Sequence, residues 1–174
     1  MFIGREKEFL EMNRRYAEKN FQLLILYGRR RVGKTTLLKE FCREKNHIFY
    51  SAEQSNEKLN LEKFSAEIFR HYSETALEPF RSWEKALSYI EERQREEPMV
   101  LVIDEFPYLA MINSSLLSTL QHLIDHRLRK GKLFLILCGS YMGFMEKEVL
   151  GAKSPLFGRR TAQLHMKPFD YLDS

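Results

Sequence analysis

The sequence predicts an α/β fold in which a mostly parallel sheet carries helices on both faces. Two observations support this prediction. Short, almost wholly apolar runs recur along the chain, and segments with helical spacing of apolar residues separate them. A strand that is apolar at every position is buried on both faces, which is typical of parallel sheets covered by helices. Strands that alternate with helices further indicate right-handed crossovers within one sheet.

The elements follow from these two patterns. Expected strands are residues 21–27, 47–51, 99–104, 133–138 and a weaker alternating strand at 162–166. Expected helices are residues 6–19, a helix beginning at Lys34, two helices within 57–97 separated by Glu78 and Pro79, residues 114–130, and a helix around 141–150. Gly131 is expected to end the helix at 114–130 with a left-handed cap, which glycine adopts easily.

Composition limits the kind of protein. The 174 residues are enough for one domain, and 44% hydrophobic with 30% charged residues is typical of a soluble globular protein. No apolar run approaches the roughly 20 residues of a membrane helix, and nothing resembles an export signal, so we expect a cytoplasmic protein without a membrane partner. The net charge of +4 permits nucleic acid without indicating it. Cys42 and Cys138 are expected to be buried, reduced thiols.

Residues 28–35, Gly-Arg-Arg-Arg-Val-Gly-Lys-Thr, match the Walker A pattern G-x-x-x-x-G-K-[ST] in full. They follow a predicted buried strand and open a helix, which is the context that this motif requires. Its glycines let successive amide groups converge on phosphate oxygens at the positive end of the helix. We expect Lys34 to reach the β- and γ-phosphates and the Thr35 hydroxyl to bind Mg²⁺.

The expected nucleotide contacts in this segment are Gly28, Arg31, Val32, Gly33, Lys34, Thr35 and Thr36. The side chains of the three arginines could touch phosphate, but an outward, solvated or partner-facing position is favoured over phosphate contact.

Four apolar residues followed by Asp104 and Glu105 have the form of a Walker B strand. Asp104 is expected to hold Mg²⁺ directly or through water, and Glu105 to accept a proton from the attacking water. A glutamate after the aspartate favours hydrolysis over phosphoryl transfer to a small molecule. A strand that ends in surface acids by chance is the alternative, and the intact phosphate loop upstream argues against it.

Two further positions are candidates for catalysis. Ser140 follows the fourth expected strand, where a hydroxyl could orient water or sense the γ-phosphate, or equally cap the next helix. Arg159, with Arg160, precedes the fifth strand. A guanidinium there could stabilise charge on the phosphoryl group, within the chain or across a subunit interface, or could simply lie on the surface.

Several segments together carry a family resemblance: Phe2-Ile3-Gly4-Arg5-Glu6, residues 26–35, residues 103–109, Cys138-Gly139-Ser140, and Gly158-Arg159-Arg160 ahead of Lys167-Pro168-Phe169. They resemble the archaeal-type ATPase family of prokaryotes, a group close to the AAA+ and STAND branches of the P-loop NTPases. The resemblance runs from Phe2 to about Phe169, nearly the whole chain.

This resemblance implies a three-layer α/β/α sandwich with strand order 5-1-4-3-2, and adenine held between Ile3, Gly4 and Arg5 and the phosphate loop. It also implies ATP rather than GTP, and the chain contains no Asn-Lys-x-Asp motif for guanine. Relatives of this kind continue into a helical lid, a winged-helix region and a carboxy-terminal domain. We therefore expect residues 1–174 to be one P-loop ATPase domain of a longer protein.

The sequence thus predicts a Mg²⁺-dependent ATPase that hydrolyses ATP to ADP and phosphate and couples this to a conformational change. Other functions stay open. The chain could be a nucleotide-dependent switch with little or no turnover, and its partners could be another copy of itself, a second protein, or DNA bound through a winged helix outside these residues. A small-molecule kinase is disfavoured, because beyond the helical stretch 57–97 no lid or acceptor insertion is visible.

Overall fold

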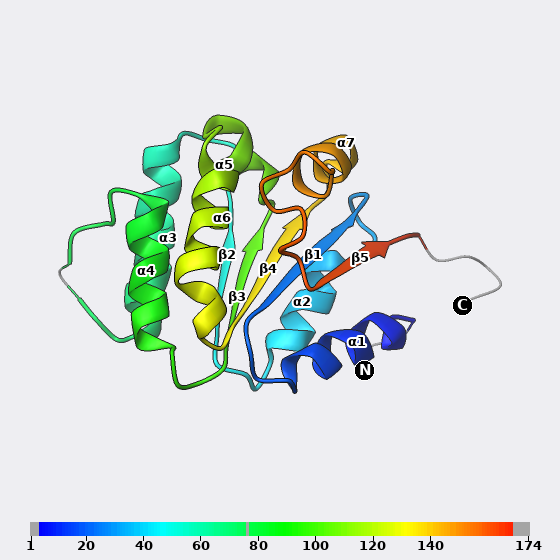
Figure 1. Cartoon of the computed structure of the whole chain (residues 1–174), viewed down its shortest axis with the longest axis horizontal. Coiled ribbons are helices and arrows are strands. Elements are labelled where there is room, and N and C mark those ends of the chain that lie inside the picture. The colour runs from blue at the N-terminus through cyan, green and yellow to red at the C-terminus, as the bar shows by residue number, and fades with distance from the viewer. Residues whose placement is uncertain (1–3, 76, 169–174) are drawn as a thin grey trace.

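The computed structural model describes residues 4–75 and 77–168, and its centre is one five-stranded parallel sheet (Figure 1). The strands lie in the order β2-β3-β4-β1-β5, which confirms the predicted order. Their bounds are β1 Gln22–Gly28, β2 His47–Ser51, β3 Met99–Asp104, β4 Leu133–Gly139 and β5 Ala162–Met166. All neighbouring strands pair in parallel. Every carboxyl end therefore lies along one edge of the sheet.

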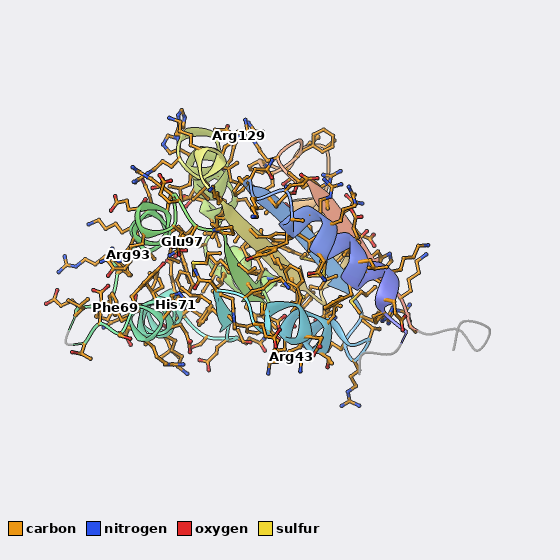
Figure 2. The ribbon with its side chains drawn as sticks, turned by 90° about the horizontal axis from the view of Figure 1, so that it is seen from below. Arg43, Phe69, His71, Arg93, Glu97 and Arg129 are labelled. Atoms are coloured by element: carbon orange, nitrogen blue, oxygen red, sulfur yellow. The ribbon has the colours of Figure 1, made fainter. Side chains whose placement is uncertain are left out.

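Helices cover both faces and make three layers. Their bounds are α1 Glu6–Tyr16, α2 Lys34–Cys42, α3 Glu57–His71, α4 Trp83–Arg93, α5 Pro107–Ile112, α6 Leu116–His126 and α7 Met142–Phe144. Figure 2, seen from below, shows the sheet between α1 and α2 on one side and α3, α4 and α6 on the other. The two faces bury separate apolar clusters, and the cluster under α1 and α2 is the smaller. The predicted α/β/α sandwich is thus confirmed.

Burial explains why the strand predictions succeed. Every residue of β1, β3 and β4 is buried, as their unbroken apolar sequences indicate. In the edge strand β5, Gln163 and His165 are exposed, which matches its alternating pattern. Cys42 and Cys138 are both buried and free, as expected. Among the described residues, no helix is long and apolar enough to cross a membrane.

Local capping fixes several helix starts. The side chain of Asn56 accepts a hydrogen bond from the amide of Leu59 at 2.8 Å, and Ser82 accepts one from Lys85 at 3.1 Å. The helix α5 begins with Pro107, whose missing N–H costs nothing at the first helical position. This helix was not predicted, although the proline two residues after Glu105 could have indicated it.

The prediction of one helix over residues 114–130 is wrong. Helix α6 ends at His126, and a separate short 3₁₀ turn spans Leu128–Lys130. Arg127 breaks the helix with φ −134° and ψ −58°, and its guanidinium binds Glu91 and Glu92 of α4 at 3.0 Å each. Gly131 has φ −109° and ψ −158°, so the predicted left-handed cap is also wrong.

The helix expected around residues 141–150 forms only in part. The turn α7 has three residues and continues as a wider π-helical turn, Met145–Val149. Met145 and Val149 are buried against the sheet, while Glu146, Lys147 and Glu148 are exposed. This turn and residues 151–161 then lead back to the start of β5, as Figure 1 shows.

Candidate nucleotide site

The phosphate loop connects the carboxyl end of β1 to the start of α2. Gly28 lies so close to β5 that a Cβ atom there would be 2.3 Å from the carbonyl oxygen of Met166. Gly33, which precedes α2, has φ +95°, a conformation that side chains rarely adopt. Arg31 also has a positive φ, +67°. The loop therefore has the curled backbone that the glycine pattern predicts.

Lys34 begins α2 and turns back over this loop. Its Nζ donates hydrogen bonds to the carbonyl oxygens of Gly28 at 2.8 Å and Arg29 at 2.6 Å, and the residue is only 6% exposed. Burial lowers the pKa of Lys34, while the charges of Glu105 and Asp104 oppose that change. The ammonium group is thus held at the centre of the loop.

Thr35 and Asp104 meet although 69 positions separate them in the chain. The Thr35 hydroxyl donates a hydrogen bond to Oδ2 of Asp104 at 2.9 Å. The other carboxylate oxygen of Asp104 accepts a bond from the amide of Glu105, also at 2.9 Å. Asp104 is 4% exposed. The two residues predicted as metal ligands are therefore in direct contact and point oxygen atoms at one place.

Glu105 follows Asp104 in a left-handed backbone conformation with φ +55°. Burial and the neighbouring charge of Asp104 raise the pKa of Glu105, whereas Lys34, Arg30 and a hydrogen bond from Ser140 lower it. The net direction is upward. Ser140 directly follows β4 and lines the same cavity as Glu105.

These residues surround one cavity of about 430 Å³. From the loop and the start of α2 it is lined by Arg30, Arg31, Gly33, Lys34, Thr35 and Thr36. The opposite side is formed by Glu105, Tyr108 and Ser140. Arg30 and Tyr108 were not among the predicted site residues. The two residues are 78 positions apart in the chain, and no local sequence pattern predicts the hydrogen bond between them.

The amino-terminal segment reaches the outer side of the loop. One nitrogen of the Arg5 guanidinium donates to the carbonyl oxygens of Val32 at 2.9 Å and Lys167 at 2.7 Å, and Arg5 is 6% exposed. Arg5 thus lies beside Val32 of the phosphate loop. Ile3 lies outside the described residues. Contact of this segment with adenine stays a prediction.

Arg159 is not brought to this cavity. Its guanidinium binds the carboxylate of Asp125 at 3.1 and 2.9 Å. Nearby, the amide of Thr161 donates to Leu23, the second residue of β1, so this segment lies toward the amino ends of the strands. The predicted cis role at the phosphoryl group does not fit this placement, because the cavity lies at the carboxyl ends of the strands, whereas Arg159 comes just before the amino end of β5.

We expect Arg159→Ala to change ATP affinity by less than about twofold, because the substitution affects an ion pair remote from the cavity. The measurement is titration calorimetry, with Asp125→Ala as the matched control that breaks the same pair. A large affinity loss in Arg159→Ala alone would contradict the placement and favour contact with a second subunit.

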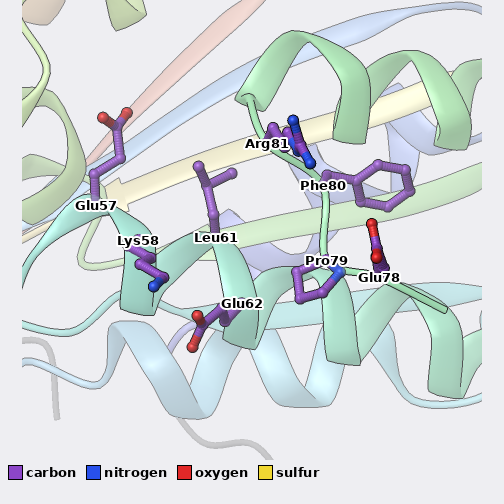
Figure 3. A pocket seen from close by; sticks show the side chains of 8 residues that line it. All are labelled: Glu57, Lys58, Leu61, Glu62, Glu78, Pro79, Phe80 and Arg81. Carbon is purple, nitrogen blue, oxygen red and sulfur yellow. The ribbon is translucent and has the colours of Figure 1, made fainter. Parts of the chain in front are cut away.

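A larger cavity, about 700 Å³, lies between α3 and residues 78–81 (Figure 3). Its charged lining comprises Glu57, Lys58, Glu62, Glu78 and Arg81. Three carboxylates against two bases disfavour a triphosphate. Glu57 also accepts bonds from Trp83 at 2.9 Å and Asn113 at 2.6 Å, so part of this wall is a structural network. By charge, the smaller cavity therefore suits a triphosphate better than the larger one does.

Comparison with solved structures shows the same fold in three archaeal proteins. The ORC2 protein of Aeropyrum pernix, solved as ADPNP-ADP complexes, has a TM-score of 0.66 and 14% identity, covering 99% of this chain and 50% of that chain. CDC6P of Pyrobaculum aerophilum has a TM-score of 0.68 and 17% identity, and the match covers 99% of this chain and 48% of that chain. The ORC1 protein of Aeropyrum pernix, solved in complex with DNA, has a TM-score of 0.68 and 17% identity, and the match covers 98% of this chain and 47% of that chain.

Sequence relatives point to the same group. The uncharacterized protein MJECL04 of Methanocaldococcus jannaschii is 32% identical over 172 residues, which cover 98% of this chain and 37% of that protein. MJ0423 of the same organism, described as an ATP-binding protein, is 49% identical over 45 residues, 26% of this chain and 76% of the relative. The chain spans about a third of MJECL04. The family described as "ATPase domain predominantly from Archaea" matches residues 2–174. The chain belongs to this family of archaeal-type ATPase domains.

Proposed function

We propose that the domain binds Mg²⁺-ATP in the 430 Å³ cavity and hydrolyses it to ADP and phosphate. The observation that carries this proposal is the 2.9 Å contact between Thr35 and Asp104. It joins the phosphate loop to the Asp-Glu pair: Lys34, Thr35 and Glu105 line one cavity, and Asp104 contacts Thr35. Family membership supports nucleotide binding in addition.

The loop is suited to a triphosphate by charge and by backbone geometry. Its amides precede an α2 helix of nine residues, whose amino end favours an anion. Lys34 now bonds to two neutral carbonyl oxygens, and anionic phosphate oxygens are stronger acceptors for an ammonium group. We therefore infer that Lys34 exchanges the carbonyls of Gly28 and Arg29 for β- and γ-phosphate oxygens when ATP enters.

The same residues are suited to Mg²⁺. Thr35 and Asp104 supply hard oxygen donors, and this metal prefers to keep water and phosphate oxygens in the rest of its octahedral shell. Within residues 4–75 and 77–168, no three His, Cys, Asp or Glu side chains form a metal cage, which is compatible with such a site. When bound, Mg²⁺ would neutralise charge on the phosphate oxygens.

Glu105 is our candidate for the general base. Its carboxylate lines the cavity and would take a proton from a water molecule as the water oxygen attacks the γ-phosphorus. The bond from the γ-phosphorus to the β,γ-bridging oxygen then breaks, and ADP leaves with the electron pair. Ser140 lines the same cavity and would donate a hydrogen bond to Glu105 that holds its carboxylate in line with the water.

Coupling of hydrolysis to a conformational change is the next part of the proposal. The site spans the loop before α2, the turn before α5 and the end of β4, so ligand contacts would pull on three separate elements. An association with DNA, or with further copies of the chain, is proposed only for a protein in which further regions accompany this domain. It is supported by the likeness to ORC proteins, one of which is solved in complex with DNA.

The proposal is tested by Mg²⁺-ATP binding and turnover in the wild-type chain and in Lys34→Ala. We expect the substitution to weaken ATP binding by at least about tenfold, because a positive charge against the phosphates is lost. Titration calorimetry measures the affinity, and phosphate release measures turnover. Lys39→Ala is the matched control, since Lys39 is an exposed lysine of the same helix.

Two results would contradict the proposal. One is a folded wild-type chain that fails to bind ATP at millimolar concentration. The other is equal affinity in Lys34→Ala and the wild type. A wild-type chain that binds ATP tightly, with no phosphate release above background, would instead favour a nucleotide-dependent switch.

A further inference from the structure

We propose that Arg30 is an in-chain contact for the terminal phosphate group of ATP, and that it exchanges its bond to Tyr108 for this phosphate. This inference rests on the proposed function and adds a residue to it. It concerns the arginine side chains of the phosphate loop, for which the sequence alone favours an outward position. The structure separates the three arginines, because Arg30 and Arg31 line the cavity whereas Arg29 does not.

The position of Arg30 is fixed by its hydrogen bond to Tyr108. A guanidinium nitrogen of Arg30 donates to the Tyr108 hydroxyl oxygen at 3.1 Å. Tyr108 is the second residue of α5, and only Phe106 separates this helix from Glu105. The guanidinium thus crosses from the phosphate loop to the side of the cavity where the proposed base lies, instead of extending away from it.

The surrounding charges agree with this position. Burial and Asp104 raise the pKa of Glu105, and Arg30 acts against them together with Lys34. Burial lowers the pKa of Lys34, and the like charge of Arg30 adds to that effect. Arg30 is therefore close enough to both groups to interact with them electrostatically. A triphosphate that extends from Lys34 toward Glu105 would bring its terminal phosphate between them, beside Arg30.

The chemistry of the contact favours an exchange of partners. In the structure Arg30 is exposed and donates to a neutral phenol. A phosphate oxygen carries negative charge and matches the planar fork of a guanidinium, so it is the stronger acceptor. When the γ-phosphate is present, Arg30 leaves Tyr108 and binds phosphate. When only ADP is bound, Arg30 stays on Tyr108 and links the loop to α5.

The experiment compares the affinities of two nucleotides, so that it does not depend on turnover. The probes are Mg²⁺-ADP and the Mg²⁺ complex of the imido analogue of ATP, which resists hydrolysis. For Arg30→Ala we expect about tenfold weaker binding of the imido analogue, and less than about twofold change for ADP. Arg30→Lys should fall between wild type and Arg30→Ala, because the charge remains and the planar fork is lost.

Arg29→Ala is the charge-matched control, because it removes the same charge from the neighbouring position, which does not line the cavity. Both nucleotides should lose affinity by the same small factor in this variant. Tyr108→Phe tests the exchange itself. Removing the hydroxyl frees Arg30, so binding of the imido analogue should become somewhat tighter while ADP binding is unchanged. Thermal melts of all variants check that each one is folded.

A merely structural Arg30–Tyr108 link predicts something different. Arg30→Ala and Tyr108→Phe would then change affinity in the same direction, with no preference for the triphosphate, and that result would overturn the inference. Wild-type protein that binds neither nucleotide would instead overturn the proposed function, and this inference with it. Wild type that binds both nucleotides, with equal losses in Arg30→Ala, leaves the proposed function standing and rejects the role of Arg30.

Discussion

Glu105→Gln should slow ATP hydrolysis by roughly 10²- to 10⁴-fold, the usual contribution of a positioned general base. Glutamine has nearly the same shape as glutamate but cannot accept the proton of the attacking water. ATP affinity should stay close to that of the wild type, because Lys34 and the loop amides remain. Phosphate release under single-turnover conditions measures the rate, and calorimetry measures the affinity.

Glu97→Gln serves as the control for this experiment, because Glu97 is exposed and lies in the connection between α4 and β3, before the amino end of the sheet. Its rate should equal the wild-type rate. Equal rates in Glu105→Gln and the wild type would exclude Glu105 as the base. Loss of ATP binding in Glu105→Gln would instead indicate that the residue holds the nucleotide.

The pH dependence of the wild type provides a second test of Glu105. A base must be ionised to work, so the rate should rise as the pH increases through the pKa of Glu105. Burial and Asp104 raise that pKa above the ordinary value of 4.5, which moves the rise toward neutral pH. This acidic limb should be absent from the pH profile of Glu105→Gln.

Phe41→Ala should lower the free energy of unfolding by about 3–5 kcal/mol, as expected for removal of a fully buried phenylalanine. Phe41 is 0% exposed and lies at the centre of the smaller apolar cluster. Its ring packs edge-on against Phe9 and Tyr16 of α1, and against Phe134 of β4 at 5.4 Å. Removing it leaves a cavity where α1, α2 and the sheet meet.

Urea unfolding followed by circular dichroism measures this change. Leu10→Ala is the control, because Leu10 is on α1 and 68% exposed, and its loss should change the free energy of unfolding by less than about 0.5 kcal/mol. Similar unfolding midpoints for Phe41→Ala and Leu10→Ala would show that α1 and α2 are not packed on the sheet through Phe41.

The sheet could be predicted because strands that are buried on both faces are continuous runs of apolar residues in the sequence. The bounds of His47–Ser51 and Met99–Asp104 were predicted to the residue. Helix α6 was predicted too long, because Leu128 continues the apolar spacing of the helix although Arg127 leaves it to bind α4. Tertiary contacts of this kind override a local pattern.

The candidate site likewise has parts that the sequence predicts and parts that it does not. The phosphate loop and the Asp-Glu pair are compact motifs, and the carboxyl ends of parallel strands bring them together as expected. Arg159 failed as a cis candidate because its place depends on the path of the chain between α7 and β5, which the sequence does not reveal. The contact of Arg30 with Tyr108 depends on an unpredicted helix, α5, and was missed for that reason.

The left-handed backbone at Glu105 has a consequence for how the protein can evolve. A non-glycine residue with φ near +55° is strained by about 1 kcal/mol or more, and neighbouring contacts must hold it there. Two such contacts are visible, since Asp104 accepts the amide of Glu105 and the amide of Phe106 donates to Cys138 in the next strand. Replacements that relax this turn would stabilise the fold, but they would change the direction in which the side chain at position 105 points. If Glu105 is the proposed base, selection for stability and selection for activity would therefore favour different residues at position 105.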